Sequence, residues 1–122
     1  MKFMKKIIST FFVLGISLAA NRLSAQELTA PQMKAIYTDN IDVFKKQFAK
    51  ADYNKCFVVK TNTYSPLGFS AMYGKNEIVK YLLDNKADIN KPCTEKTPLD
   101  LAELGERKET VKLLLEKGAV KN

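Results

Sequence analysis

The sequence repeats itself at a spacing of about 32 residues. The stretch SPLGFSAMYG, which begins at Ser65, returns in altered form as TPLDLAELGE, which begins at Thr97. The match continues without a gap into the next segment, where these residues correspond: Ile78, Val79, Leu82 and Leu83 to Thr110, Val111, Leu114 and Leu115. Repetition over such a length and spacing predicts one structural unit stacked in layers, rather than a duplicated active site.

Each copy carries the signals of two short helices. Thr97 is suited to cap the first helix with its hydroxyl, and the proline after it occupies the first helical position, where a missing N–H costs nothing. Gly105 is expected to end this helix. A second helix is predicted over about residues 108–117, because apolar residues recur there at helical spacing. In the earlier copy, Ser65 is the cap and the second helix covers about residues 76–85.

A weaker third copy lies upstream of these two. Residues 40–54 align with residues 75–90 if one residue is missing near Lys50, and a preceding helix is expected at about residues 31–38. The predicted organisation is therefore an N-terminal capping repeat over residues 26–54, a second repeat with an extended connecting segment over residues 55–90, and a C-terminal repeat over residues 91–122.

A helical pair of about 33 residues with Thr-Pro-Leu near its start resembles the ankyrin repeat. The resemblance covers the chain from about Gln32 onward, and it rests on Thr97, Pro98, Leu99, Ala102, Glu109, Val111, Leu114, Leu115, Gly118 and Ala119, and on Ser65, Pro66, Leu67, Gly74, Glu77, Val79, Leu82, Leu83, Ala87, Asp88, Ile89 and Asn90. It implies an all-α fold, an ankyrin-type helical repeat solenoid, with about three helix pairs joined by extended finger loops.

Three positions depart from the family pattern. The histidine that usually follows Thr-Pro-Leu is Gly68 in one copy and Asp100 in the other, so the hydrogen bonds that it makes between neighbouring loops are expected to be absent. Gly68 within a helix should cost about 1 kcal/mol relative to alanine. Ser70 replaces the usual alanine of the packing seam. Since three repeats are close to the minimum that buries a continuous core, we expect a stack of marginal stability.

Residues 1–25 have the order of a secretory signal peptide. Three lysines within the first six residues precede an apolar run of 14 residues from Ile7 to Ala20, and Ala25 is suited to be the last residue before cleavage. The run is shorter than the roughly 20 residues that a membrane-spanning helix needs. Cleavage after Ala20 and an uncleaved anchor both stay open. We predict a periplasmic or secreted protein with no membrane contact once the leader is removed.

Most of the positive charge belongs to this leader. The whole chain has 20 Lys and Arg against 13 Asp and Glu, a net charge of +7. Removal of the leader takes away Lys2, Lys5, Lys6 and Arg22 but no acid, which leaves 16 basic against 13 acidic residues, or about +3. A nucleic-acid partner is not expected, because this excess is small and export separates the chain from nucleic acid.

No set of residues suggests catalysis or cofactor binding. The sequence has no histidine, which rules out Ser-His-Asp and Cys-His arrangements, and it has no glycine-rich phosphate loop. Two cysteines without histidine make a poor zinc site. Glu106 and Glu109 lie close together, but the basic residues between them indicate a solvent-exposed helix face. We expect no enzyme activity, no metal and no other cofactor.

Cys56 and Cys93 lie in the two segments that connect one repeat to the next. By the resemblance these segments are fingers that stand side by side, and a disulfide requires their Cα atoms to lie within about 7 Å. Two alternatives stay open: a Cys56–Cys93 disulfide, which an exported protein permits, and two buried or free thiols. A disulfide would close a loop of some 37 residues and contribute roughly 3 to 4 kcal/mol to stability.

The first finger is longer than the second. It holds ten residues, KCFVVKTNTY from Lys55, whereas the second holds six, KPCTEK from Lys91. Its β-branched and aromatic residues favour extended backbone, and Thr61–Asn62 allows a turn, so we predict a protruding hairpin. This hairpin is either a tolerated insertion, with Phe57 or Val59 packed against the stack, or a contact loop for a partner.

By the same resemblance, the residues just before each mid-repeat turn face the concave surface. Aromatic residues and methionine are enriched at interface hot spots. The predicted partner-binding residues are therefore Tyr37, Met72, Tyr73 and Leu104 in a row, Tyr64 at its edge, and Phe57 on the finger. The alternative is that one or two of them turn inward and belong to the core.

Taken together, these features favour an exported protein-binding module that captures a protein partner through its concave face and finger loops. By resemblance, small exported ankyrin proteins include ones that neutralise a toxin or assist an enzyme, and either role suits this chain. The alternative is a structural or assembly component of the cell envelope. A small enzyme or metal binder fits less well, because no polar cluster is evident. We expect the protein to be a monomer.

Overall fold

A computed structural model describes residues 26–121. This part of the chain forms three helix pairs: α2 (Ala30–Tyr37) with α3 (Ile41–Gln47), α4 (Pro66–Met72) with α5 (Asn76–Asp84), and α6 (Pro98–Leu104) with α7 (Lys108–Glu116). Between the first two pairs lie a 3-10 helix, η1 (Lys50–Asp52), and the strands β1 (Phe57–Val59) and β2 (Asn62–Tyr64). The predicted signal peptide lies outside the described residues.

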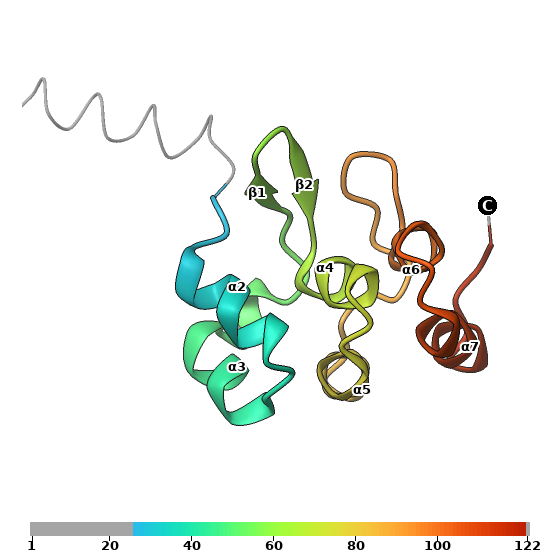
Figure 1. Cartoon of the computed structure of the whole chain (residues 1–122), viewed down its shortest axis with the longest axis horizontal. Coiled ribbons are helices and arrows are strands. Elements are labelled where there is room, and N and C mark those ends of the chain that lie inside the picture. Colours follow the sequence, from blue (N-terminus) through green and yellow to red (C-terminus); the bar gives the residue numbers. More distant parts are fainter. Residues whose placement is uncertain (1–25, 122) are drawn as a thin grey trace, which may run out of the picture.

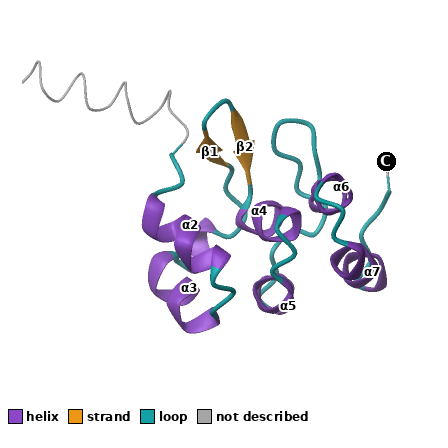
Figure 2. Ribbon diagram, viewed as in Figure 1, coloured by secondary structure: helices purple, strands orange, loops and turns teal. Residues whose placement is uncertain are grey.

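The helices are arranged in two rows. In Figure 1, α2, α4 and α6 follow one another in one row, and α3, α5 and α7 follow in a second row beside it. The strands and the loop before α6 project from the side of the first row. Figure 2 shows the two strands, in orange, which pair as a two-stranded sheet. The result is a helical repeat fold with a small two-stranded sheet. The expected all-α class did not include this sheet.

Side-chain caps open the first helix of each pair, and those at Ser65 and Thr97 are the ones that the sequence predicts. The Ser65 hydroxyl accepts a hydrogen bond from the backbone N–H three residues later, at 2.9 Å. Thr97 accepts from the N–H of Asp100 at 3.2 Å, and the Asp100 carboxylate accepts from the N–H of Thr97 at 2.9 Å, which completes a capping box. Thr29 and Gln32 form the same box at α2. The Ser-Pro and Thr-Pro pairs are therefore helix starts.

The apolar core runs through all three helix pairs. Large side chains with no more than 2% of their surface exposed come from each repeat and include Ile36, Phe44, Leu67, Phe69, Ile78, Leu82, Leu99, Leu101 and Leu114. Ser70 is also fully buried, and its hydroxyl donates a 2.7 Å hydrogen bond to the Pro66 carbonyl. The serine in the packing seam is therefore satisfied within its own helix, which limits the cost of its burial.

Gly68 allows α4 to lie close to α6. A Cβ atom at this position would come within 2.9 Å of Leu101 Cδ1, and α4 and α6 are the most closely packed pair of helices in the described chain. This contact gives a reason for a residue that otherwise weakens a helix. The helices α2 and α4 do not approach one another as closely; the rings of Tyr37 and Phe69 meet there, with centroids 5.9 Å apart.

Each mid-repeat turn contains a residue with a positive φ, and the first helix of the last repeat ends at Gly105, as predicted. Asp39, Gly74 and Glu106 adopt φ angles of 52°, 67° and 57°. Gly105 is the C-terminal cap of α6, and its φ of −79° is one that any residue adopts. A Cβ atom on Gly105 would collide with the carbonyl oxygen of Met72. The glycine is therefore required by the close approach of the neighbouring repeat.

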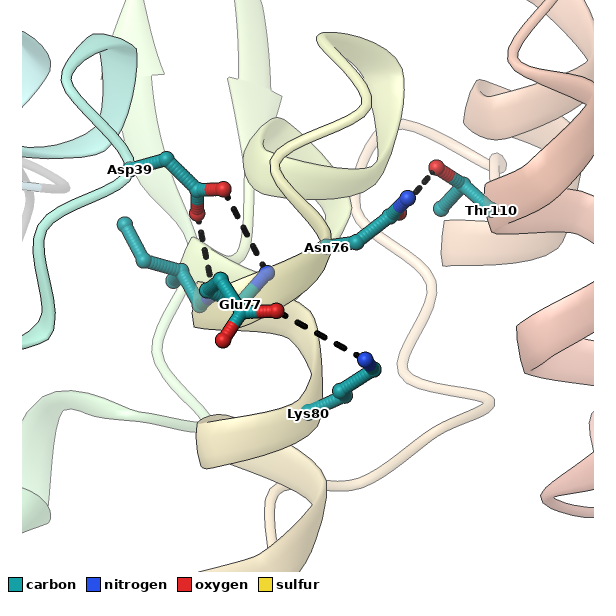
Figure 3. Close-up of polar contacts among 6 residues, drawn as sticks. Asp39, Asn76, Glu77, Lys80 and Thr110 are labelled. Atoms are coloured by element: carbon teal, nitrogen blue, oxygen red, sulfur yellow. Dashed lines mark hydrogen bonds and ion pairs between the residues drawn. The ribbon is translucent and has the colours of Figure 1, made fainter.

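Polar side chains connect each turn to the second helix of the next repeat. The Asp39 carboxylate accepts hydrogen bonds from the backbone N–H groups of Ile78, at 3.0 Å, and Glu77, at 3.4 Å, at the start of α5 (Figure 3). The residue before α5 supplies no side-chain cap of its own. Asn76 and the Thr110 hydroxyl form a hydrogen bond that links α5 to α7 in a similar way (Figure 3).

A second series of bonds connects the ends of the repeats. The Asn54 side chain accepts from the N–H of Asp88 at 2.7 Å, and the Asn90 side chain accepts from the N–H of Val120 at 3.0 Å. The histidine bonds expected to be missing are thus replaced by other links between layers, made by asparagines that recur at corresponding places in the sequence.

Candidate functional site

The long finger forms the predicted hairpin, with its turn one residue earlier than expected. Strands β1 and β2 pair antiparallel, with Val59 opposite Asn62. The turn residues are therefore Lys60 and Thr61 rather than Thr61 and Asn62, and Lys60 adopts a φ of 58°. A two-residue turn fixes the register of the strands and hence the face that each side chain occupies.

Phe57 anchors the base of this hairpin in the core. Its side chain has no exposed surface, and its ring lies edge-on to that of Phe48 with the centroids 5.7 Å apart. A partner cannot reach a side chain in this position. The structure therefore removes Phe57 from the predicted partner-binding residues, and the inward-facing alternative holds for this residue.

The outward-facing backbone groups of the hairpin already have partners. In β1, the Val58 N–H donates to the Gln26 carbonyl and the Val58 carbonyl accepts from the Leu28 N–H, both at 2.9 Å. In β2, the Thr63 N–H donates to the Thr94 hydroxyl at 2.9 Å. These two residues carry the groups that point away from the strand pair. Neither edge of the hairpin is therefore open to a further strand.

A disulfide joins the two fingers. The structure pairs Cys56 with Cys93, the first of the two alternatives that the sequence leaves open, with a Cα–Cα distance of 5.9 Å. The Thr63 and Thr94 hydroxyls, which lie 2.6 Å apart, add a second link between the fingers. The hairpin is thus held against the rest of the stack by a covalent bond as well as by hydrogen bonds.

A hollow of about 480 Å³ lies between the hairpin and the helices α2 and α4. Residues from two repeats and the finger line it, and these include four of the predicted binding residues: Tyr37, Tyr64, Met72 and Tyr73. Leu104 is 62% exposed but borders a different, smaller hollow of about 60 Å³. The predicted row across three repeats is therefore concentrated in the first two.

Four aromatic rings form one cluster in this hollow. The rings of Tyr37 and Tyr73 meet edge to face at 5.2 Å and 84°, and Phe69 lies 5.0 Å from Tyr73 and 5.5 Å from Tyr64. Phe69 is almost completely buried, whereas Tyr37 is 44% exposed. Desolvation, followed by the bond to Tyr73 and its charge, raises the pKa of Tyr37, so this phenol stays neutral at ordinary pH.

Several lining residues were not predicted, among them Phe69 and Met33 from the helices. A signal for Phe69 existed, because it is aromatic at the position where the next copy has Leu101. Charges are sparse around the hollow, where Glu27 and Lys60 also contribute to the lining. Polar and apolar atoms share the exposed lining almost equally: the aromatic and methionine side chains come mainly from the helices, and Lys60, Thr61 and Asn62 come from the hairpin turn.

Two kinds of feature are absent from residues 26–121. No group of three or more His, Cys, Asp or Glu side chains in this range is placed to hold a metal ion. No helix within the same range has the length and apolar character required to cross a membrane.

The repeated helix pairs, their connecting fingers and the hollow beside them define a repeat scaffold of the kind that binds other molecules. Residues 32–122 match the family of ankyrin repeats in three copies, and the chain belongs to this family. The resemblance found in the sequence is thereby confirmed. Ankyrin repeats are generally protein–protein interaction modules and are typically non-enzymatic. No curated protein matches the chain.

Proposed function

We propose that this protein is an exported binding module that captures a protein partner through the hollow between its hairpin and its first two repeats. The observation that carries the proposal is the convergence of Tyr37 from α2, Tyr64 from β2, and Met72 and Tyr73 from the end of α4 on one hollow. Aromatic and methionine side chains of this kind often dominate the binding energy of interfaces. Neutralising a toxin or assisting an enzyme would both use such a surface.

Export is the second part of the proposal. It is supported by the order of basic, apolar and small residues in residues 1–25, and a disulfide between the fingers suits an oxidising compartment. Mass spectrometry of the protein purified from the cell envelope or medium tests it. The expected N-terminus is Gln26, or Asn21 if cleavage follows Ala20; a chain that retains its leader would contradict the proposal.

Partner capture is tested with matched surface variants. Tyr64→Ala and Tyr73→Ala each remove a ring from the hollow, whereas Val43→Ala removes apolar surface from α3, where Val43 is 38% exposed and does not line the hollow. Each tyrosine variant should weaken capture from an envelope extract by at least about 2 kcal/mol, or roughly 30-fold, and the valine variant should leave it unchanged. Unchanged capture by both tyrosine variants would exclude this surface.

An assembly component of the envelope is the second candidate. One observation favours it: Leu115 and Val120, near the end of the last repeat, are 48% and 61% exposed. Light scattering of the purified protein distinguishes the two functions, because an assembly component should self-associate at micromolar concentration and a capture module should stay monomeric.

A further inference from the structure

We propose that the hollow is an anchor pocket for one aromatic side chain of the partner, carried on a loop or helix and not on a strand added to the hairpin. This inference rests on the proposed function, because it gives the chemistry of the partner captured at the same site. Size, lining, charge and the closed hairpin edges each contribute to it.

The size of the hollow suits a single large group. Sites that hold small molecules measure about 300 to 1,000 Å³, and this hollow, at about 480 Å³, lies in the lower part of that range. An indole or phenyl group is smaller than this volume, so the hollow has room for one large side chain. The partner would therefore insert a side chain and leave its backbone at the rim.

The lining favours an aromatic group over an aliphatic one. The rings of Tyr37 and Tyr73 stand at 84° to each other, and Tyr64 stands at 64° to Phe69. Aromatic rings prefer edge-to-face or offset contacts, so a further ring finds a suitable face or edge in each of these orientations. Met33 and Met72 complete the lining, and thioethers adapt their shape to a ring and contact it favourably.

The charges of the hollow do not select an ionic anchor. Glu27 and Lys60 are the lining residues with full charges, and their charges offset each other. Tyr37 adds no charge, because a phenol with an ordinary or raised pKa is neutral at neutral pH. A buried lysine, arginine or carboxylate of the partner would lose its hydration without a dedicated counter-charge, which is unfavourable.

The hairpin edges indicate how the partner presents its aromatic side chain. A peptide that adds a strand needs unpaired backbone N–H and carbonyl groups, but those of Val58 are bonded to Gln26 and Leu28, and the N–H of Thr63 is bonded to Thr94. Because both edges are occupied, a partner strand cannot pair with the hairpin, and we take side-chain insertion as the mode of binding.

Helix spacing places the pocket in the first two repeats. Gly68 brings α4 against α6, and the hollow beside Leu101 and Leu104 measures only about 60 Å³. The helices α2 and α4 are less closely packed, and the long finger extends the wall above them. The anchor pocket therefore depends on the extra residues of the first finger.

Methionine labelling provides a direct test. The chain has four methionines, of which Met33 and Met72 line the hollow and Met1 and Met4 lie in the predicted leader. The full chain, labelled with 13C at the methionine methyl groups, is titrated with the amides of N-acetyl-tryptophan, N-acetyl-leucine and N-acetyl-lysine. The signals are assigned by Met→Leu substitution.

The tryptophan amide should shift the Met33 and Met72 signals saturably, with a dissociation constant on the order of 1 mM. The leucine amide should bind at least threefold more weakly, and the lysine amide should not bind. Tyr73→Ala should weaken tryptophan amide binding at least threefold, and Val43→Ala should not change it. Equal binding of the leucine and tryptophan amides, or shifts without saturation, would overturn the aromatic anchor.

The capture assay separates this inference from the proposed function. If Tyr64→Ala and Tyr73→Ala lose capture while the tryptophan amide does not bind, the function stands and the aromatic anchor is wrong. If the amide binds at Met33 and Met72 while capture does not depend on these tyrosines, the proposed function is wrong and the hollow is a site for a small aromatic ligand.

Discussion

At the scale of single residues, several positions are determined by contact with the adjacent repeat rather than by their own helix. Gly68 faces Leu101 in α6, and Gly105 lies against the Met72 carbonyl. Tyr53 is buried and donates a hydrogen bond to the hydroxyl of Tyr81, in α5, at 3.2 Å. Because these residues contact the adjacent repeat, the free energy of unfolding depends on how closely the repeats stack.

Gly105→Ala should destabilise the protein. A glycine-to-alanine change at an ordinary φ normally stabilises by about 0.4 to 1 kcal/mol, because it restricts the unfolded chain. Here the added Cβ collides with a backbone carbonyl, and overpacking of this kind costs about 1 to 3 kcal/mol. Urea denaturation measures the sign, with the exposed Glu116→Ala as the control. A stabilised Gly105→Ala variant would show that the repeats are not in such close contact.

Alkaline pH should destabilise the protein partly through Tyr53. Burial, followed by the hydrogen bond and the charge of Tyr81, raises the Tyr53 pKa above its usual value of 10.0. Because the folded pKa exceeds the unfolded one, this contribution is complete below about pH 10 and is lost as the pH rises above that value. The free energy of unfolding should therefore fall as the pH rises from about 10 to about 11, less steeply in Tyr53→Phe. Equal slopes for the two proteins would contradict this account.

At the scale of elements, the second helices begin with support from the preceding repeat. The N-terminus of α5 receives the Asp39 carboxylate, and α7 is bonded through Thr110 to Asn76. The fingers follow the same rule, since β2 is bonded at Thr63 to Thr94 of the next finger. The helices α5 and α7 and the strand β2 are therefore each bonded to a neighbour distant in sequence.

Substitutions at Asp39 test this support for α5. Asp39→Gly relieves the positive φ but removes the acceptor, so it should cost about 1 to 2 kcal/mol, as the loss of a helix cap does. Asp39→Asn keeps an acceptor and tolerates the same φ, so its cost should stay below about 1 kcal/mol. Urea denaturation of both variants compares them. Equal stability of the glycine variant and the native protein would exclude a capping role.

At the scale of the whole molecule, the fingers and helices act together to form the hollow. The disulfide ties the hairpin to the second finger, Phe57 ties it to the core, and residues before α2 close its outer edge. With only three repeats available, these links supply stability that a longer stack would gain from additional layers.

Reduction of the disulfide should lower the melting temperature markedly. The bond spans a sequence separation of 37 residues, and a loop of this length corresponds to about 3 to 4 kcal/mol. For a domain of this size such a loss shifts the midpoint by more than about 10 °C. Thermal denaturation with and without dithiothreitol measures it, and the Cys56→Ser/Cys93→Ser variant should not respond to the reductant. An unchanged midpoint after complete alkylation of both thiols would contradict the prediction.

The sequence by itself determined the repeats, the helix starts and the hairpin. Caps such as Ser65 and Thr97 act within one turn of helix, and strand-forming residues act within a few positions, so these signals are local and readable. It also led to the choice of Tyr37, Met72 and Tyr73, because their positions just before each mid-repeat turn recur from copy to copy, and of Tyr64 at the edge of their row.

Only the tertiary structure decided how the layers meet. The inward position of Phe57, the reason for Gly105, the pairing of Cys56 with Cys93 and the separation of Leu104 from the hollow all depend on distances between segments of different repeats. A repeat pattern specifies which faces stack, but the spacing of two layers depends on the side chains of both. That spacing is close between α4 and α6 and wider between α2 and α4, and the wider spacing leaves room for the hollow.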